Sequence, residues 1–421
     1  MLDIEFIRDH IDIVREAAKK KGFATDIDAL LKADAERRRL IQEVDELRGK
    51  INVASQKIPT MGDTPDRQML IEEMRAVKEA LGVKEDTMRR AEELFQHLML
   101  TVPNVPDPSV PDGKTDADNV ELKKVGDIPV FSFPVKDYMT IMQAHDLVDQ
   151  ERGTKVAGFR GIFLKGDAAR LSIALWRYTM DFMAARGFTE MIAPTMARER
   201  NFMGTGWFPL DAQNVYQTQD DLYLVGTAEV STMGYHADEI LDADALPKKY
   251  VAFSPCYRKE AGSHGKDTKG IYRVHEFYKV EQVVLCVADH QESVKNHEEL
   301  LANSEALMQS LEIPYRVVVN CAGDLGLGQV KKYDIEAWVP SEQRYRETHS
   351  ASYFHAFQTR RLNIKYRGED GKPTFAHSLN NTAIATPRAL ISFIENHQQS
   401  DGRVKIPTAL VPYMGKEYIG A

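Results

Sequence analysis

Two runs of apolar residues near the N-terminus repeat at alternating steps of three and four positions, a spacing typical of helices that pair with one another. Between the two runs lies "PTMGDTPD", whose prolines and glycine predict a turn. The pattern therefore predicts an antiparallel coiled-coil hairpin over about residues 27–100, with arms roughly 50 Å long at about 1.5 Å per residue. Only Lys84 interrupts the apolar positions, which are Leu40, Val44, Leu47, Ile51, Ala54 and Ile58, then Leu70, Met74, Val77, Leu81, Met88, Ala91, Phe95 and Leu98.

The surface of this hairpin is consistent with two roles. Long helical hairpins often only pair subunits or separate domains. The cations Arg37, Arg38, Arg39, Arg48, Lys50 and Lys57 could instead face phosphates, although acidic residues are interleaved with them. The net charge of −9 excludes a uniformly basic nucleic-acid binder, so any RNA site must be a local basic patch.

A proline-rich stretch, "TVPNVPDPSVPDGKTDADN", ends the helical periodicity. We therefore predict a helical domain over residues 1–104, which begins with one amphipathic helix at residues 1–22, and a second domain over residues 105–421. In the second domain helical patterns alternate with closely spaced β-prone runs, which favours an α+β fold with an antiparallel sheet and flanking helices. Neither a strand-GxGxxG-helix unit nor GxxxxGK[ST] is present, so neither common parallel-sheet nucleotide fold is indicated.

The three cysteines, Cys256, Cys286 and Cys321, form neither a metal-binding spacing nor a disulfide framework. We expect a reducing, cytoplasmic setting and no zinc site. The N-terminal segment mixes acidic with apolar residues, and no apolar run is long enough to cross a bilayer, so neither a signal peptide nor a membrane span is expected.

The stretch "FSPCYRKEAGSHGKDTKGIYRVHEFYKVEQVV" predicts two strands joined by a polar, glycine-rich tip. Arg258 and Arg273 stand at the bases of this hairpin, and Phe277 and Glu281 share one face of the returning strand. Two arginines on a rigid sheet can clamp a polyphosphate, an aromatic ring can stack on a base, and a nearby carboxylate can bind a metal or an ammonium group. The hairpin alone is equally consistent with an ion-paired sheet surface.

Three further segments carry polar residues next to predicted strands or helices. Hard oxygen ligands at a strand end suit Mg²⁺, and an arginine in the first turn of a helix favours an anionic ligand. Taken singly, each fits a solvated edge as well. The residues are Glu347 and Ser350 in "YDIEAWVPSEQRYRETHSAS", Asn380, Thr382 and Arg388 in "SLNNTAIATPRALISFIENHQ", and Thr227 and Glu229 in "LVGTAEV".

Together these segments resemble the seryl-tRNA synthetases, which are class II aminoacyl-tRNA synthetases, over essentially the whole chain. "GFTEMIAPTM" resembles the first class II motif, the dimer-interface helix and strand that end at a proline, here Pro194. "YRKEAGSHGKDTKGIYRVHEFYKVEQ" is similar to the second motif in its serine-specific form, and "LNNTAIATPRALISFIENHQ" to the third.

The resemblance implies a role for each matching residue. Arg258 and Arg388 would be catalytic, holding the α- and γ-phosphates of ATP, while Phe277 stacks on adenine and Glu281 binds the ammonium of serine. Glu347 and Ser350 would hold Mg²⁺ with ATP. The implied serine-binding residues are Thr227, Ala228, Glu229, Arg258, Glu281, Asn380 and Thr382, and the implied ATP-binding residues are Arg258, Lys259, Glu260, Val274, Phe277, Glu347, Thr348, His349, Ser350 and Arg388.

The resemblance also implies the reaction and its partners. Serine and ATP would form seryl-adenylate and pyrophosphate, and the serine would pass to the 3′ end of tRNA(Ser), with tRNA(Sec) left open as a second substrate. The tip "SHGKDTKG" would meet the acceptor end of the tRNA. The helical arm would lie along the long variable region of a tRNA charged by the other subunit of a homodimer.

The run after Glu347 departs from the family pattern. His349, Ala351, Tyr353 and Ala356 stand where the family has a serine, a cysteine, an asparagine and an aspartate. This leaves two rival functions: a non-charging synthetase-like paralogue that binds RNA or has a structural role, and a ligase that loads a small amino acid onto a carrier protein. The arm argues against the carrier-protein ligase, while the arginines and Glu281 argue against a catalytically inactive paralogue.

Overall fold

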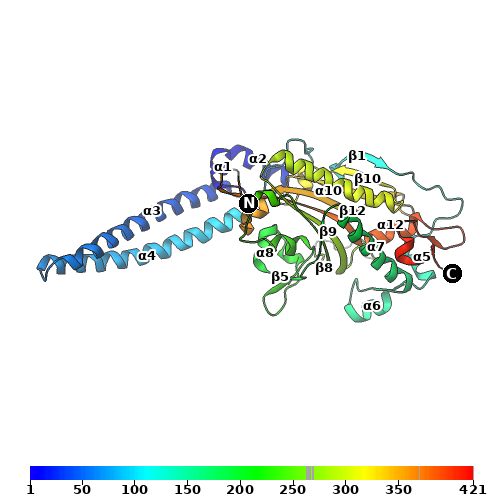
Figure 1. Cartoon of the computed structure of the whole chain (residues 1–421), viewed down its shortest axis with the longest axis horizontal. Helices are drawn as coiled ribbons and strands as arrows, with labels where there is room; N and C mark the ends of the chain where they lie inside the picture. Colours follow the sequence, from blue (N-terminus) through cyan, green and yellow to red (C-terminus); the bar gives the residue numbers. More distant parts are fainter. Residues whose placement is uncertain (262–266, 268–269, 369, 421) are drawn as a thin grey trace. The chain divides into compact units, whose positions relative to one another are not determined.

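The computed structural model describes residues 1–261, 267, 270–368 and 370–420 (Figure 1). The chain divides into two compact units. The smaller unit comprises Asp3–Lys19 and Phe23–Val102, and the larger comprises Met1–Leu2, Lys20–Gly22 and Pro103–Ala421. The division therefore falls within two residues of the end of the predicted helical domain.

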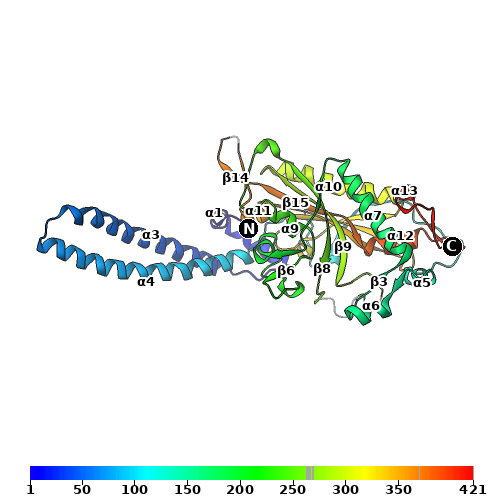
Figure 2. The same cartoon turned by 60° about the horizontal axis from the view of Figure 1, so that its bottom comes forward.

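The smaller unit is helical, with α1 (Ile4–Asp9), α2 (Ile11–Lys21), α3 (Ile27–Lys57), a short 3-10 turn (Ile58–Thr60) and α4 (Pro65–Thr101). Helices α3 and α4 lie side by side along their length (Figure 2). The side chain of Asp26 caps the start of α3 and that of Thr64 caps the start of α4, which Pro65 opens. The single helix predicted over residues 1–22 is wrong. It is broken at His10, which takes a non-helical conformation although the sequence has neither glycine nor proline there.

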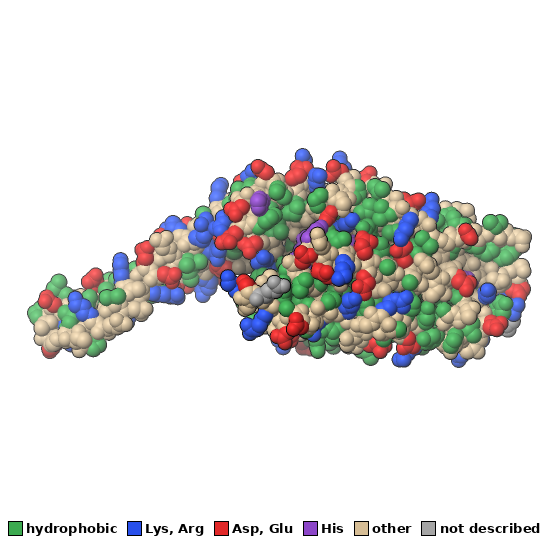
Figure 3. Space-filling view, turned by 45° about the horizontal axis from the view of Figure 1, so that its top comes forward, with side chains coloured by type: hydrophobic (Ala, Val, Ile, Leu, Met, Phe, Trp, Pro, Cys, Tyr) green, Lys and Arg blue, Asp and Glu red, His purple; other side chains and the backbone are tan. Residues whose placement is uncertain are grey.

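The predicted coiled-coil arm is confirmed. Leu40, Val44 and Ala54 of α3 and Met74 and Phe95 of α4 are buried, all at predicted apolar positions. The interruption at Lys84 is accommodated by an ion pair to Glu43 of α3, at 2.6 Å. Acidic and basic side chains are interspersed along the arm in the view of Figure 3.

The larger unit is built on an eight-stranded sheet with the order β1-β10-β11-β12-β15-β9-β8-β4. Every pairing in it is antiparallel except that of β4 with β8. This confirms the predicted α+β class. The strands are β1 (Val120–Val125), β4 (Thr189–Ile192), β8 (Lys248–Tyr257), β9 (Glu276–Cys286), β10 (Tyr315–Val319), β11 (Lys331–Val339), β12 (Arg344–His355) and β15 (His377–Thr386).

Smaller elements surround this sheet. None of the helices in the described residues is long and apolar enough to span a bilayer. The remaining elements are α5 (Tyr138–Ala144), β2 (Val148–Asp149), α6 (Gln150–Ala157), β3 (Phe163–Leu164), α7 (Gly166–Ala184), β5 (Met196–Arg198), α8 (Glu199–Thr205), β6 (Leu222–Leu224), α9 (Glu229–Gly234), β7 (Ile240–Leu241), α10 (His290–Ser310), α11 (Phe357–Leu362), β13 (Lys365–Arg367), β14 (Pro373–Phe375), α12 (Arg388–Asn396), β16 (Val404–Lys405), α13 (Val411–Met414) and β17 (Tyr418–Ile419).

The main hydrophobic core lies between the sheet and helices α7, α10 and α12. Gln282 of β9 and Asn381 of β15 both donate to the carbonyl of Leu300 in α10, at 3.3 and 2.7 Å, so these two side chains face the helices. Because neighbouring side chains alternate along a strand, Glu281 and Thr382 point to the opposite face. The polar residues singled out in the sequence therefore gather on the face of the sheet that α10 does not cover.

Candidate active site

Arg258 directly follows β8, and Arg273 lies three residues before the start of β9. The ladder runs from Lys248 opposite Leu285 to Tyr257 opposite Glu276, and the N–H of Arg258 donates to His275 O at 3.0 Å. The predicted long hairpin is thus confirmed. Of its tip, "SHGKDTKG", only Asp267 and Gly270 fall within the described residues, so the contact predicted for the tip lies almost wholly outside them.

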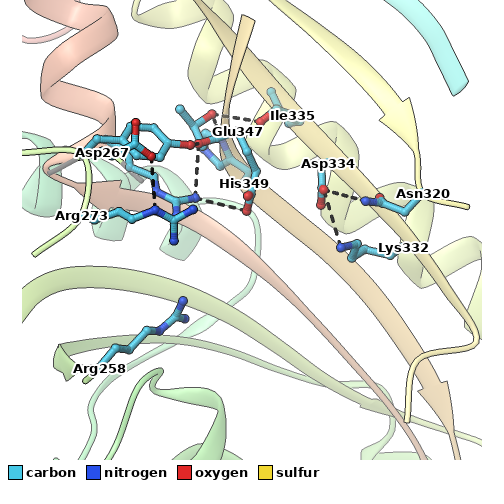
Figure 4. Close-up of polar contacts among 12 residues, drawn as sticks. Arg258, Asp267, Arg273, Asn320, Lys332, Asp334, Ile335, Glu347 and His349 are labelled. Atoms are coloured by element: carbon cyan, nitrogen blue, oxygen red, sulfur yellow. Dashed lines mark hydrogen bonds and ion pairs between the residues drawn. The ribbon is translucent and has the colours of Figure 1, made fainter. Parts of the chain in front are cut away.

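Guanidinium and carboxylate groups alternate beside this hairpin (Figure 4). Arg273 donates to Glu260 at 3.0 Å and to Asp267 at 3.2 Å. Arg388, the first residue of α12, pairs with Glu347 of β12 at 3.2 Å. These arginines come from separate segments but converge on one site, where phosphate oxygens of a ligand could take the place of the carboxylates.

Arg258 has a different environment. Its Nε and Nη2 both donate to Gly226 O at 3.2 Å, and its guanidinium lies over the rings of Trp207 and Phe277 at 5.6 and 5.4 Å. No carboxylate of the described residues lies within ion-pair distance of it. Figure 4 shows it apart from the Arg273 and Glu347 groups. Its charge therefore remains available to an anionic ligand.

Glu229 and Glu281 form a pair of acidic side chains near Arg258. Burial is the main cause that raises the pKa of Glu281, opposed by Lys279, with which it forms a buried ion pair, and by Arg258. Burial and the negative charge of Glu281 raise the pKa of Glu229 to about 7. The two carboxyl groups thus differ: Glu281 has a cation paired with it, whereas the hydrogen bonds that the carboxyl of Glu229 receives from described residues come from amides, chiefly Gln358 at 2.6 Å.

The polar groups around these two acids come from three elements. Thr382 of β15 hydrogen-bonds Glu281, and Asn380 of the same strand hydrogen-bonds Glu229. The hydroxyl of Thr227 accepts the N–H of Glu229 at 3.3 Å and so fixes the start of α9, while Ala228 is fully buried behind it. The result is a cluster of two carboxyls, two hydroxyls and an amide, a set of groups that suits a small zwitterionic ligand.

Glu347 and Ser350 lie on the open face of β12. Burial would raise the pKa of Glu347, but the nearby cations Arg388, Lys332 and Arg258 hold it below its usual value, so the group is a carboxylate. Ser350 stands directly opposite Asp334 of β11, a buried acid whose pKa desolvation raises to about 6 against the effect of Lys332. Asp334 and Lys332 form a separate polar group with Asn320 (Figure 4).

Magnesium fits Glu347 and Ser350, although within the described chain no three His, Cys, Asp or Glu side chains form a metal cluster. Mg²⁺ is commonly bound by one or two protein carboxylates, with substrate phosphates and water as the other ligands. An ionised glutamate and a serine hydroxyl beside a group of arginines match that pattern.

Some predicted ATP-binding residues do not offer their side chains to the open face. The His349 ring is buried between Thr348 Oγ1 at 2.8 Å and Ala383 O at 3.0 Å, and burial lowers its pKa to about 4, so the ring is neutral. The hydroxyl of Thr348 donates to Ile335 O at 3.1 Å. Val274 is buried as well. These three residues can reach a ligand only through the backbone.

Of the other two predicted residues beside Arg258, Lys259 is exposed and Glu260 is half-buried. Lys259 lies over the ring of Tyr216 at 5.5 Å, and Glu260 is the left-handed residue at φ 53° that receives Arg273. Four residues of the site were missed by sequence reasoning, and only Lys279 had a signal, because it alternates with Glu281 along the same strand face. The missed residues are Trp207, Tyr272, Lys279 and Gln358.

Two sequence families match the chain. The family described as the seryl-tRNA synthetase N-terminal domain matches residues 1–106. The family described as the tRNA synthetase class II core domain (G, H, P, S and T) matches residues 213–397. The two matches fall on the helical region and on the sheet that carries the candidate site.

Full-length relatives agree with these two matches. The serine–tRNA ligase of Deinococcus radiodurans is 46% identical, and the alignment covers 100% of this chain and 99% of the relative. A solved seryl-tRNA synthetase from Pyrococcus horikoshii, in complex with ATP, superposes with a TM-score of 0.90 at 38% identity and covers 100% of this chain and 99% of its own. A cytoplasmic serine–tRNA ligase from Naegleria fowleri, in complex with AMP, gives 0.86 at 32% identity, with 100% and 98% covered. This chain therefore belongs to the seryl-tRNA synthetase family, with a class II aminoacyl-tRNA synthetase core behind an N-terminal helical arm.

Proposed function

We propose that this chain is a serine–tRNA ligase that activates L-serine with ATP and transfers it to tRNA(Ser). The observation that carries the proposal is the position of Arg258. Its positive charge acts to lower the pKa of Glu281, one of the two paired acids, and the pKa of Glu347, which pairs with Arg388. A single arginine thus acts on both the acidic pair and the group of arginines and carboxylates, which is where the carboxylate of serine and the α-phosphate of ATP must meet.

Serine binding follows from the pocket chemistry. Glu281 already has Lys279 as its cation, whereas Glu229 has no cationic side chain bonded to it among the described residues. We therefore assign the ammonium of serine to Glu229, in place of Glu281, and the hydroxyl of serine to Glu281 and Thr382. A site built to bond a hydroxyl rejects alanine, because its own buried polar groups would be left unpaired.

The ATP side uses the arginines and the open face of β12. Arg258 would bind the α-phosphate, Arg388 the γ-phosphate, and Phe277 the adenine. Glu347 and Ser350 would hold a magnesium ion, which supplies charge neutralisation to the phosphates when it is bound. These side chains hold the reactants in line and stabilise the charge that develops on the phosphates.

The reaction needs no covalent enzyme intermediate. A carboxylate oxygen of serine attacks the α-phosphorus of ATP, the bond to the β-phosphate oxygen breaks, and pyrophosphate leaves. A hydroxyl of the terminal tRNA ribose then attacks the acyl carbon, and AMP leaves with the bonding electron pair. Positioning and charge stabilisation are thus the main work of the protein, and no side chain is nominated as a nucleophile.

The macromolecular partners are further parts of the proposal. The first-motif segment exposes large apolar side chains, Ile192 at 85% and Met196 at 54%, which supports burial of this edge in a homodimer. The arm has two exposed lysines, Lys50 and Lys57, that can bind an RNA backbone.

The three cysteines are buried and unpaired, which supports a cytoplasmic setting. Whether tRNA(Sec) is also charged is left to experiment.

The proposal is tested by amino-acid-dependent exchange of labelled pyrophosphate into ATP. Serine should support exchange, while alanine, threonine, cysteine and glycine should support little. Arg258→Ala should reduce the serine-dependent rate by at least 100-fold, an effect comparable to the loss of about 3 kcal/mol of transition-state stabilisation. Exchange with none of the amino acids would instead favour a non-charging paralogue, and near-normal exchange in Arg258→Ala would remove that residue from its role.

A further inference from the structure

Tyr272 is a half-buried aromatic residue that lies against several arginines of the site and has no role in the reaction described above. The guanidinium of Arg346 lies 3.7 Å from the centre of its ring, that of Arg388 lies at 4.6 Å, and that of Arg273 at 6.0 Å. An aromatic face attracts a cation through its quadrupole, most strongly where water is excluded. The ring is therefore a neutral partner for the cations that face the phosphate group.

Tyr272 and Arg388 also share one backbone anchor. The Tyr272 hydroxyl donates to Glu347 O at 3.2 Å, and Arg388 Nη1 donates to the same carbonyl at 3.3 Å. The ring and the guanidinium are thus held in one position relative to β12. Glu347 therefore contacts Arg388 twice, through its backbone carbonyl and through its side-chain carboxylate, the latter at 3.2 Å.

The partners of Arg388 differ in what happens to them when the nucleotide binds. The Glu347 carboxylate would turn to the metal that accompanies ATP, so its hold on Arg388 weakens when the arginine is needed. The ring of Tyr272 and the backbone carbonyl carry no net charge and stay in place. Without them a long arginine side chain would have to lose its rotational freedom each time it meets a phosphate.

We propose that Tyr272 is a positioning residue that holds Arg388 for the γ-phosphate of ATP, an inference that rests on the phosphate role given to Arg388 in the proposed function. Tyr272 contacts the arginine and not the reacting atoms. Its effect is therefore specific to ligands that carry a γ-phosphate. A seryl-adenylate analogue has no such phosphate and should be insensitive to the ring.

The test compares Tyr272→Leu with Tyr272→Phe by calorimetric titration of Mg²⁺–ATP and of the sulfamoyl analogue of seryl-adenylate. In Tyr272→Leu, the dissociation constant for ATP should rise roughly tenfold, within the range of a desolvated cation–π contact, and that for the analogue should stay within about twofold. Tyr272→Phe keeps the ring and should stay within about threefold of the unaltered protein for both ligands. In the exchange assay KM for ATP should rise in Tyr272→Leu while KM for serine does not.

Two controls separate positioning from a general structural effect. Tyr345→Leu removes a ring of the same strand as Glu347 that lies near Arg316 at 5.3 Å and Lys124 at 5.8 Å, cations other than the three that Tyr272 contacts, and it should leave both titrations unchanged. Adding Tyr272→Leu to Arg388→Ala should not weaken ATP binding further, because the ring acts through that arginine.

Three results would overturn the proposal: equal weakening of ATP and the analogue in Tyr272→Leu, equal loss in the Phe and Leu variants, or additive losses in the double variant. If the unaltered protein binds ATP but shows no serine-dependent exchange, the proposed function fails while the ATP titrations still decide the role of Tyr272. If it does not bind ATP at all, both fail.

Discussion

At the scale of single residues, Glu229 and Glu281 show how neighbouring groups set the ionisation of two adjacent acids. Glu281 is buried beside Lys279, and the adjoining carboxyl of Glu229 receives its hydrogen bonds, among the residues that the structure describes, from the amides of Gln358 and Asn380. A nearby cation favours the charged form of an acid, whereas burial and a like charge favour the neutral form. The pair therefore has one carboxylate with a permanent counter-ion and one that is only partly ionised near neutral pH.

This difference predicts how serine affinity depends on pH. The pKa of Glu229 is raised to about 7, and the ammonium of serine would bind its deprotonated form. Roughly a tenth of the group is ionised one pH unit below that value and nine tenths one unit above it. KM for serine in the exchange assay should therefore fall roughly tenfold between pH 6 and pH 8 at saturating ATP.

Glu229→Gln provides the matched control for this prediction. The amide keeps the size and the Gln358 and Asn380 neighbours but cannot titrate, so KM for serine should be high and independent of pH. A pH dependence that survives in Glu229→Gln would assign the titration to another group, and a flat profile in the unaltered protein would contradict the assignment of the ammonium to Glu229.

At the scale of elements, the arm satisfies most of its arginines internally. Asp34 is fully buried and pairs with Arg8, Arg37 and Arg38 at 3.1–3.2 Å. Arg39 pairs with Glu36 and Glu43 on its own helix. Arg37, Arg38 and Arg39, which the sequence analysis considered as possible RNA contacts, are thus occupied by ion pairs within the helical unit.

Two lysines of α3 are better placed for an RNA backbone. Lys50 and Lys57 are exposed, lie two turns apart on one flank of the helix, and have no carboxylate partner within the fully described arm. The double variant Lys50→Ala/Lys57→Ala should raise KM for tRNA about fivefold and reduce the slope of its salt dependence by about two, while pyrophosphate exchange stays unchanged.

Arg48 is the control for these lysines. It lies on the opposite flank of α3 and pairs with Glu85 of α4 at 2.7 Å, so Arg48→Ala should change KM for tRNA by less than about twofold. If Arg48→Ala weakens charging and the double lysine variant does not, the RNA lies on the other flank.

Local pattern predicted the elements well, and long-range contacts explain what it missed. The hairpin predicted over about residues 27–100 agrees with α3 and α4, because a seam between two helices is a periodic property of the sequence itself. The break at His10 has no such signal. Gln358 reaches Glu229 from α11, 129 positions along the chain, and Tyr272 meets Arg388 only because the second-motif hairpin and α12 converge on one site. The side-chain direction of His349 likewise depends on a bulge in the β12 pairing near Glu347.

At the scale of the whole molecule, the chain consists of a helical unit and a sheet unit with separate cores. The amino-acid and phosphate residues all lie in the sheet unit, so activation of serine should not need the arm. The proposed RNA binding by the arm would enter only at transfer. The proposed homodimer adds a question of geometry, because an arm can serve the site of its own subunit or that of its partner.

A mixture of two inactive proteins answers that question. One variant lacks residues 49–84, joined by a short glycine turn, and keeps the buried Leu40, Val44 and Phe95 at the base of the arm. It should retain exchange but lose tRNA charging. The other is Arg258→Ala, which keeps its arm and loses activation. Each homodimer should charge tRNA poorly, at a few per cent of the unaltered rate or less.

Co-expression of the two variants with different affinity tags yields the mixed dimer. In this dimer the subunit without residues 49–84 has the intact site, and the Arg258→Ala subunit has the intact arm. If the arm serves the partner, this dimer should charge tRNA at up to roughly half the unaltered rate, because one of two sites is restored. Failure of the mixed dimer to charge, with its exchange activity intact, would show that each arm serves its own subunit. A monomeric unaltered protein would contradict the dimer on which the experiment depends.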